Sequence, residues 1–247
     1  RLNQNLAPMG DRRIQIDSVT MASIVNGNKA LFHDGAQVKE AFREGYYSRA
    51  AGFDWYENER VLALLNGSDH TTVTINDASI ATGDAALTIA GSNYTEGSVF
   101  TLGLAGTRVE AVHPETKNSY GYLKQFVATN TGTTGLTFAQ PYIFGAGLPK
   151  QNVSALPVNG DAVTFFGTAS TSYKNALAYH KDFCAFVTAD LPMMADAAEC
   201  SVRNQDGISV RVWKGSDIRN DELLMRIDIL YGYKVLRPEW ACRINCT

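Results

Sequence analysis

The stretch Glu222–Leu236, ELLMRIDILYGYKVL, alternates between two kinds of position along its whole length. One set of alternate residues is apolar: Leu223, Met225, Ile227, Ile229, Tyr231, Tyr233 and Val235. The other set mixes apolar and charged residues with a glycine: Leu224, Arg226, Asp228, Leu230, Gly232, Lys234 and Leu236. Such alternation is typical of a strand, and about fourteen residues at about 3.3 Å each reach roughly 45 Å. Because ordinary strands have about five or six residues, the sequence predicts an unusually long strand whose apolar face needs a cover.

The neighbouring segments predict a partner strand and a helix for this strand. Gly207–Gly215, GISVRVWKG, alternates in the same way, and the polar loop Ser216–Asp221 joins the two segments as an antiparallel hairpin. Upstream, Ser172–Leu191 repeats apolar residues at helical spacing. Ser172 is placed to cap the start of that helix, and Pro192 follows its end. We expect this helix to cover part of the apolar face of the long strand.

The middle of the chain has a different composition. Residues 68–168 contain only eleven charged residues, although the whole chain is 19% charged. Short alternating runs rich in Thr and Gly, such as TTVTI and GLTFAQPYIF, are separated by turn sequences such as Thr-Gly-Asp and Val-Asn-Gly-Asp. Strands of four to six residues with this punctuation indicate a small all-β barrel or sandwich.

The first part of the chain mixes helix and strand. Arg12–Ile16 alternates like a short strand, and a helix follows, with Ser18 as its N-cap and Gly27 as its end. Ala36–Tyr47 predicts a second short helix ended by Gly45, and Gly52–Leu65 returns to extended structure. Since mixed α and β texture resumes after residue 168, the all-β segment is interpreted as an insertion. The predicted division is 1–67, 68–168 and 169–247.

Composition excludes several classes of protein. The net charge of −3 and the isoelectric point near 5.8 argue against a surface that grips nucleic acid throughout, although not against a protein that encloses it. No run approaches eighteen apolar residues, so no membrane span is expected. The four cysteines form no metal-ligand motif and are interpreted as reduced thiols of a cytosolic compartment. The chain opens on Arg1 and is interpreted as a piece whose N-terminal portion lies outside it.

The search for catalytic chemistry finds none. The sequence has no nucleophile elbow, no phosphate-binding glycine loop and no HExxH motif, and its four histidines are isolated from one another. We therefore predict that the protein is not an enzyme and binds no metal or cofactor. An unrecognised hydrolase is one alternative. Another is a carbohydrate- or surface-binding Ig-like module, because Trp55, Tyr56, Tyr120 and Tyr122 would suit a sugar surface.

The C-terminal residues 207–244 resemble the last strands of tailed-bacteriophage major capsid proteins, in particular the coat proteins of short-tailed phages that carry an inserted β-domain. The likeness rests on an aromatic-Gly pair followed by Arg-Pro-Glu, here Leu230, Tyr231, Gly232, Tyr233, Arg237, Pro238 and Glu239. Other segments resemble the same family in the same order. They are NLAPMGDRRIQID (5–17), the region 31–61 with its Gly-Phe-Asp-Trp-Tyr run, VHPETKNSYGYLKQFVAT (112–129), QNVSALPVNGDAV (151–163) and KNALAYHKDFCAFVTADLPM (174–193).

The resemblance implies an α+β fold of the Hong Kong ninety-seven capsid type, with an axial domain (1–67), an inserted all-β domain (68–168), and a remainder with a peripheral domain (169–247). It also implies that the N-terminal arm, the extended loop and the long spine helix of such proteins precede Arg1. The part of the apolar face of Glu222–Leu236 that the Ser172–Leu191 helix leaves open would face that spine helix.

The implied role is a structural subunit of an icosahedral virion shell, assembled in the host cytoplasm around double-stranded DNA. Its partners would be copies of itself in hexamers and pentamers, with scaffolding and portal proteins, and no membrane. We expect the turn Ile75–Asp84 to reach a neighbouring capsomer, where Asp77 and Asp84 pair with basic side chains; exposed pairs of this kind contribute about 0–1 kcal/mol each. Further candidate contacts between subunits are Arg226, Asp228, Arg237 and Glu239.

Overall fold

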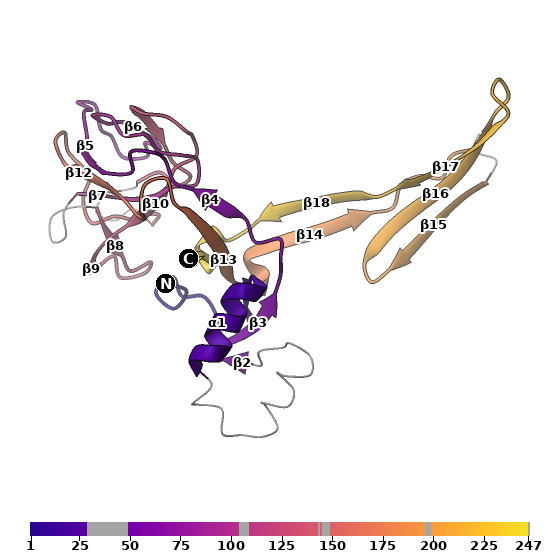
Figure 1. The fold of residues 1–247 in the computed structure, drawn as a ribbon, viewed down its shortest axis with the longest axis horizontal. Coiled ribbons are helices and arrows are strands. Elements are labelled where there is room, and N and C mark those ends of the chain that lie inside the picture. Colours follow the sequence, from indigo (N-terminus) through magenta and orange to yellow (C-terminus); the bar gives the residue numbers. More distant parts are fainter. Residues whose placement is uncertain (29–48, 104–108, 143, 145–148, 196–198, 247) are drawn as a thin grey trace. The chain divides into compact units, whose positions relative to one another are not determined.

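Strands dominate the structure (Figure 1). The computed structural model describes residues 1–28, 49–103, 109–142, 144, 149–195 and 199–246. Strands make up 48% of the described residues and helices 8%, and α1 is the one α-helix among them. The predicted α+β fold of the Hong Kong ninety-seven type is therefore wrong, because segments that were expected to be helical pair as strands. No helix in the described part of the chain is long and apolar enough to cross a membrane.

The elements follow one another along the chain as nineteen strands, one α-helix and two short 3-10 helices within the described ranges. In the first part they are β1 (Arg12–Ile16), α1 (Ser18–Asn28), β2 (Arg49–Ala50), β3 (Phe53–Glu57) and β4 (Ala63–Leu65). In the middle they are β5 (Thr72–Thr74), β6 (Ala86–Thr88), β7 (Val99–Leu102), β8 (Glu110–Val112), β9 (Ser119–Leu123), β10 (Gln125–Val127), β11 (Gly135–Thr137) and β12 (Ala162–Phe165). The rest are β13 (Ser172–His180), η1 (Lys181–Phe183), β14 (Cys184–Ala189), β15 (Glu199–Gln205), β16 (Ile208–Asp217), β17 (Glu222–Asp228), β18 (Leu230–Val235), η2 (Pro238–Trp240) and β19 (Ala241–Cys246).

Two compact units share these elements. The first unit contains residues 1–180 and 241–247, and the second contains residues 181–240. The predicted division into 1–67, 68–168 and 169–247 assigns roles to segments of the chain and stays a prediction.

A mixed six-stranded sheet forms the base of the first unit, in the order β19-β13-β1-β3-β2, with β4 also paired to β13. β1, as predicted, is a strand; it runs parallel to β3 (Arg13 opposite Asp54) and antiparallel to β13 (Arg13 opposite Tyr179). Its alternate residues Ile14 and Ile16 are buried. These pairings join segments up to about 170 residues apart, so long-range contacts decide the sheet.

The helix predicted after β1 is confirmed as α1, but its cap is Asp17 and not Ser18. The Asp17 carbonyl accepts the first helical hydrogen bond from the Met21 N–H, and the Asp17 carboxylate accepts the Thr20 hydroxyl. The backbone N–H of Thr20 also bonds to this carboxylate, so Asp17 satisfies a donor that the first turn leaves open. Gly27 lies inside the helix, which the structure follows to Asn28.

The middle segment forms an all-β module, as its composition predicts. A four-stranded antiparallel sheet, in the order β10-β7-β12-β5, and the pair β11-β6 contribute side chains to one apolar cluster, and β8 and β9 form a further pair. Phe100 is fully buried at the centre of that cluster, with ring centroids 5.8 Å from Phe126, 5.8 Å from Phe138 and 5.6 Å from Phe165. This cluster is the main hydrophobic core of the first unit.

The module and the sheet meet closely at Gly67, one residue before the predicted start of the module. A Cβ atom at Gly67 would lie 1.7 Å from the backbone oxygen of Asn93, so only glycine fits there. On the far side, the Asn66 amide donates to the Thr168 oxygen (3.0 Å). The two ends of the module are thus held together where they join the sheet.

The second unit consists of two separate ladders (Figure 1). β15, β16 and β17 form a three-stranded antiparallel sheet, and β14 pairs with β18. The hairpin predicted between Gly207–Gly215 and the long strand is confirmed, with Asp217 opposite Glu222 at its closed end. The long strand itself is interrupted at Ile229, where it leaves β16 and takes β14 as its partner.

The helix predicted over Ser172–Leu191 is wrong. Ser172–His180 is the strand β13, Lys181–Phe183 is a 3-10 turn, and Cys184–Ala189 is the strand β14. No helix from this segment covers the long strand, because β14 pairs edge to edge with β18 instead. The helix predicted over Ala36–Tyr47 lies outside the described residues.

Candidate functional site

The hairpin of β16 and β17 is organised around the carboxylate of Asp228. This side chain is only 11% exposed and accepts from Arg211 Nη2 (2.6 Å), from Trp213 Nε1 (3.2 Å) and from Arg226 Nε (2.6 Å). The Arg211 hydrogen bond is the largest influence on the pKa of Asp228 and lowers it, so the carboxylate is ionised at neutral pH. The predicted contact residues Arg226 and Asp228 are brought together, but their contact lies within one chain.

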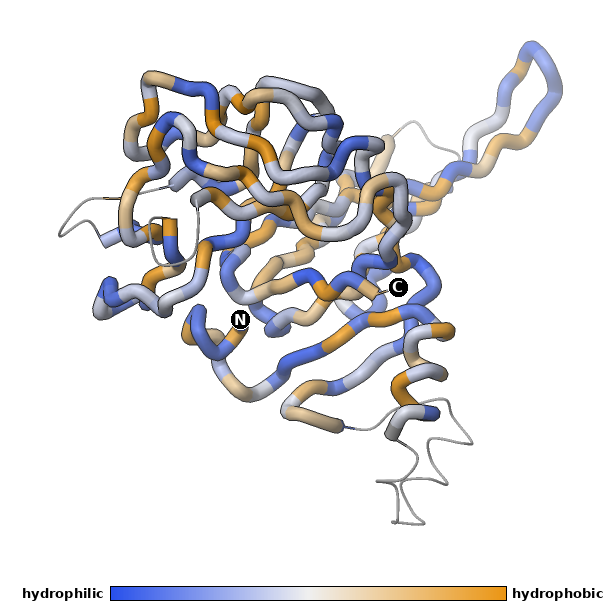
Figure 2. The backbone as a smooth tube through the Cα atoms, turned by 60° about the vertical axis from the view of Figure 1, so that its left-hand side comes forward, coloured by the Kyte–Doolittle hydropathy of each residue, from blue (hydrophilic) through white to orange (hydrophobic). Residues whose placement is uncertain are grey.

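Apolar side chains cover the outside of the second unit. Along β17 and β18 the side chains of Leu223 and Tyr233 are 73% and 78% exposed. On β14, Phe186 stands opposite Tyr233 and stacks on Tyr231, with ring centroids 5.9 Å apart. Hydrophobic and hydrophilic residues alternate along this part of the chain (Figure 2). The solvent-facing side of a strand normally carries polar residues, whereas the face with Leu223, Tyr231 and Tyr233 is apolar.

We call this surface the apolar arm. It consists of exposed hydrophobic side chains on both faces of β14, β17, β18 and the residues beside them: Phe186, Val187, Leu223, Leu224, Met225, Ile227, Ile229, Leu230, Tyr231, Tyr233, Val235 and Leu236. β17 and β18 are also edge strands of their ladders, so their backbones leave donors and acceptors open on one side. Exposed apolar patches of this extent on soluble proteins mark interaction surfaces.

The Arg-Pro-Glu segment (Arg237, Pro238 and Glu239) directly follows the last residue of the arm. The backbone N–H groups of Leu236 and Arg237 both donate to the Phe183 oxygen, at 2.8 and 3.1 Å. The Arg237 guanidinium stacks over the Trp240 ring at 4.6 Å, where a cation–π contact is favourable. Glu239 lies in the turn η2 between them. These contacts give the segment a role in ending the long strand, and its predicted contact with another subunit stays a prediction.

In the module, the predicted site residues Asp77 and Asp84 shape one turn region. The Asp77 carboxylate accepts the Ser79 N–H (3.0 Å) and the Thr88 N–H (3.2 Å), and these bonds, that from Ser79 first, lower the pKa of Asp77. Asp84 accepts the Ala81 N–H at 2.7 Å. Both carboxylates therefore hold the backbone of their own turn, whatever else they bind.

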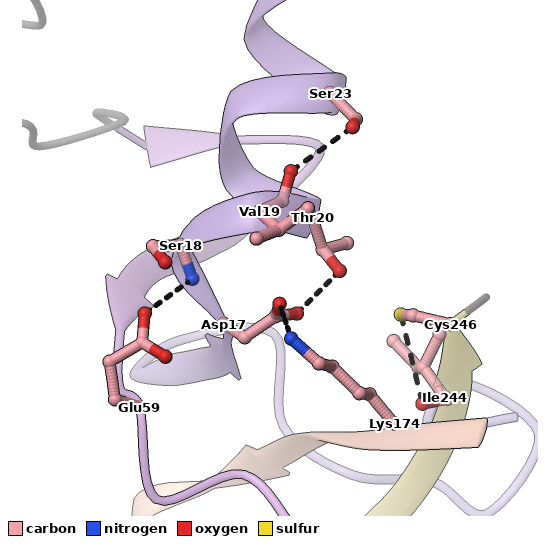
Figure 3. A network of polar contacts seen from close by, with 9 residues as sticks. All are labelled: Asp17, Ser18, Val19, Thr20, Ser23, Glu59, Lys174, Ile244 and Cys246. Atoms are coloured by element: carbon pink, nitrogen blue, oxygen red, sulfur yellow. Dashed lines mark hydrogen bonds and ion pairs between the residues drawn. The ribbon is translucent and has the colours of Figure 1, made fainter. Parts of the chain in front are cut away.

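A network of polar contacts joins α1 to the sheet (Figure 3). Lys174 Nζ donates to the Asp17 carboxylate at 2.5 Å, and the Ser18 N–H donates to Glu59 at 3.1 Å. Burial raises the pKa of Asp17, but the hydrogen bonds from Lys174 and Thr20 together outweigh burial and leave the pKa lowered. Every group in this network has a local partner, so the network is structural.

The aromatic residues that suggested a sugar surface also have partners within the chain. Tyr120 and Tyr122 stack on each other at 5.7 Å, and their hydroxyls donate to the Gln4 oxygen and the Gln4 side chain. The Trp55 indole donates to the Ala50 oxygen at 3.0 Å. The Arg13 guanidinium lies 5.9 Å from the centroid of the Tyr56 ring. All four residues therefore have partners within the first unit, and no observation favours a carbohydrate-binding module.

The comparison with protein families decides the identity. A family model described as "P22 coat protein - gene protein 5" matches residues 27–243, which is most of the chain and includes both the module and the apolar arm. The chain belongs to the P22 coat protein family. The protein is thus related to phage major capsid proteins, which are structural subunits.

A curated relative agrees with this assignment. The major capsid protein of Acyrthosiphon pisum secondary endosymbiont phage 1 is 37% identical over 79 residues. The alignment covers 32% of this chain and 18% of that protein. The part compared therefore spans less than a fifth of the relative's length.

Reasoning from sequence missed two features of this coat protein. Arg211 and Trp213, which hold Asp228, were assigned only to a hairpin strand, although a Trp and an Arg two residues apart on a strand share one face. The pairing of Phe186 with β18 was hidden because the segment Ser172–Leu191 was interpreted as a helix. The signal that could have indicated it is the run Phe186, Val187, Thr188, which is rich in residues that favour strands.

Proposed function

We propose that this coat protein is the building block of an icosahedral shell that encloses double-stranded DNA in a tailed phage. The family assignment over residues 27–243 carries the proposal. The shell is assembled in the bacterial host and becomes part of the virion. Scaffolding and portal proteins are its proposed partners besides copies of itself. A shell subunit needs surfaces that repeat under symmetry, each of which stabilises the assembly a little.

The apolar arm is the proposed contact with other subunits. Fully burying a side chain such as Leu, Ile, Phe or Met stabilises by about 1.5–3 kcal/mol, and the arm leaves twelve apolar side chains uncovered. Burial of part of that surface between subunits is enough to offset the translational and rotational entropy lost on association. The charged residues Arg226, Arg237 and Glu239 lie on or next to the arm and would set the register of the contact.

The all-β module is proposed to act as an inserted domain. The strands on either side of it, β4 and β13, are neighbours in one sheet, with Leu65 opposite Ser172. A segment whose flanking strands pair with each other interrupts its host without breaking the sheet. Residues 68–168 are the proposed inserted domain, and 1–67 and 169–247 are the proposed axial part and the remainder with the peripheral part.

Within that domain, Asp77 and Asp84 are proposed to pair with basic side chains of a neighbouring capsomer. Both also accept local N–H groups, so charge reversal would disturb the turn as well. Asp84→Asn keeps an acceptor for the Ala81 N–H and removes only the charge. We expect Asp84→Asn particles to dissociate at lower denaturant concentration than wild-type particles, with the free subunit equally stable. Equal dissociation of both kinds of particle would contradict the contact.

Electron microscopy of arm variants tests the proposed function. Met225→Lys and Tyr233→Glu each place a charge at an exposed position of the arm (62% and 78% exposed), so the subunit itself should fold normally. Val158→Lys is the matched control, because Val158 is an exposed apolar residue (42%) of the module. All are expressed in the complete reading frame, and shells are counted after sedimentation.

We expect uniform shells from wild type and from Val158→Lys, and soluble subunits from both arm variants. Circular dichroism on the soluble fraction checks that the arm variants are folded. If both arm variants assemble at wild-type yield, the arm is not the contact. If wild type forms only discrete monomers with no larger species, the shell function itself is wrong.

A further inference from the structure

A pocket of 330 Å³ in the first unit combines charge with apolar walls. Its polar side chains are Gln15, Asn58, Arg60, Asn175 and Arg243, and the remaining four of its nine lining residues are aliphatic. Two of the nine carry a positive charge, and none carries a carboxylate. Pockets that combine a few convergent polar groups with apolar walls are typical of ligand sites.

Arg243 is the charged group of this pocket that is withdrawn from solvent. It lies on β19, and its Nη2 donates to the Gly97 oxygen at 2.6 Å. That neutral carbonyl is its one hydrogen-bond partner in the described part of the chain, although a guanidinium has five N–H groups. Burial lowers the pKa of Arg243, and no described carboxylate counteracts the shift. A guanidinium in such a place is normally paired with an anion.

Asn175 is a second residue of the pocket whose hydrogen-bonding capacity is not fully used. Its Oδ1 atom is buried and has no hydrogen-bond partner in the described structure. It lies on β13 opposite Asn245, so Arg243 is its diagonal neighbour on the same face of the β13–β19 ladder. Asn175 lines the pocket beside the guanidinium, although its Oδ1 atom is itself out of reach of solvent.

We propose that this pocket binds a carboxylate carried on a short apolar stem. The carboxylate accepts from the guanidinium of Arg243, and Arg60 adds positive charge at the exposed side. The aliphatic walls cover the stem. Planar carboxylates fit the fork of a guanidinium, and the apolar walls disfavour a fully hydrated anion such as sulfate. The proposal rests on the pocket alone and holds whether or not the chain forms a shell.

Two sources could supply this group: a free organic acid, or an Asp or Glu side chain of a second copy of the chain. The chemistry is the same in both cases. A free organic acid would bind at any protein concentration. A side chain from a second copy would make the chains associate, and added free acid would inhibit that association.

Thermal unfolding of the chain with sodium butyrate tests the binding. Butyramide at the same concentration controls for the stem without the charge, and sodium chloride controls for ionic strength. A ligand that binds only the folded chain raises the Tm with the logarithm of its concentration above Kd. We expect a rise of a few degrees that grows with the logarithm of the butyrate concentration, and none with butyramide or chloride. Equal shifts with butyrate and chloride, or no shift, would overturn the proposal.

Variants assign the effect to the pocket. Arg243→Gln should abolish the butyrate shift, whereas Arg203→Gln, which changes an exposed arginine of the second unit, should leave it intact. A butyrate shift that persists in Arg243→Gln would refute the assignment. If Arg243→Gln does not fold, Asn175→Asp decides the question. This variant supplies a carboxylate from within and should raise the Tm and remove the butyrate response, while a lower Tm would refute the idea.

Sedimentation velocity then separates the two sources. If a second copy supplies the group, the wild-type chain shows an association that butyrate weakens, and Arg243→Gln lacks this butyrate-sensitive association. If butyrate binds without any change in association, the ligand is a free acid. Shell formation by arm variants is a separate measurement, so a failure here leaves the proposed coat function untouched.

Discussion

Replacing Phe100 by Ala should destabilise the all-β module by an amount that can be worked out from its surroundings. Phe100 is fully buried, and three other rings lie within 6 Å of its own. Truncation of a buried Phe to Ala costs about 3–5 kcal/mol, since the transfer free energy is lost and a cavity remains. Domains are stable by about 5–15 kcal/mol. The substitution therefore removes a large share of the stability of the module.

Amide hydrogen exchange is the suitable assay. The three tryptophans, Trp55, Trp213 and Trp240, all lie outside residues 68–168, so their fluorescence does not report on the module. Exchange of the amides in β7 and β12 does report on it, because these central strands open only when the module unfolds. Since about 1.4 kcal/mol is a factor of ten, a loss of 3–5 kcal/mol accelerates exchange roughly 150-fold to a few thousandfold.

Phe166→Ala is the matched control. Phe166 is a Phe of the same module, next to β12, but it is 41% exposed. Its truncation should cost about 1 kcal/mol or less and accelerate exchange no more than about fivefold. If Phe100→Ala and Phe166→Ala accelerate exchange equally, the aromatic cluster is not the stabilising core of the module.

Two further predictions concern charge. Burial lowers the pKa of His70 despite its hydrogen bond to Gly167. Below about pH 6.5, His70 therefore becomes protonated more readily in the unfolded chain than in the folded chain. Stability to urea should fall as pH drops from 7 to 5, and His70→Gln should flatten that slope; equal slopes would contradict the assignment. Asp17→Ala removes the cap of α1 and the partner of Lys174 and should cost about 1 kcal/mol at pH 7. Because the pKa of Asp17 is lowered in the folded chain, its stabilising effect is lost as pH falls below about 4. The difference in free energy of unfolding between wild type and Asp17→Ala, followed by Trp55 fluorescence, should therefore disappear there. A difference that persists at that pH would argue against the role of the Asp17 carboxylate.

The parts of the fold that the sequence predicts well are those set by local signals. β1 begins and ends where the alternation of Arg12–Ile16 does, and the module is bounded by turn sequences that need no distant partner. The hairpin of β16 and β17 is likewise set by its own short loop. In each case the residues that determine the structure lie within a few positions of one another.

Ser172–Leu191 shows where such reasoning fails. Ala176, Tyr179, Phe183 and Phe186 have helical spacing, but Ala176, Ala178 and His180 are buried at period two. The two periods compete within the same residues. The strand wins because β1, β4 and β19 all pair with β13. Those partners come from both ends of the chain, and no window of sequence contains them.

The sequence indicated the apolar side of the arm but not the partners that its charged residues have within the chain, and their contacts with other subunits stay predictions. Alternation identified the apolar side of Glu222–Leu236, and that side is exposed in the structure. The predicted charged contacts, by contrast, hold local geometry. Asp228 binds Arg211 and Arg226 within its own hairpin, and Asp77 binds the backbone of its own turn. A charge in a sequence has many possible partners, so its partner depends on the pairing of strands.

The change of partner at Ile229 connects the shape of the arm to its proposed role. Before Ile229 the long strand belongs to a three-stranded sheet, and after it to the two-stranded pair β14–β18. A two-stranded ladder is marginally stable in water and needs a layer against its apolar face. In this pair Phe186 and Tyr233 stand opposite each other and both are largely exposed, so within the described structure that layer is absent. The free energy that would hold the pair firmly must then come from what it packs against, and in a self-assembling coat protein we propose that other subunits supply it.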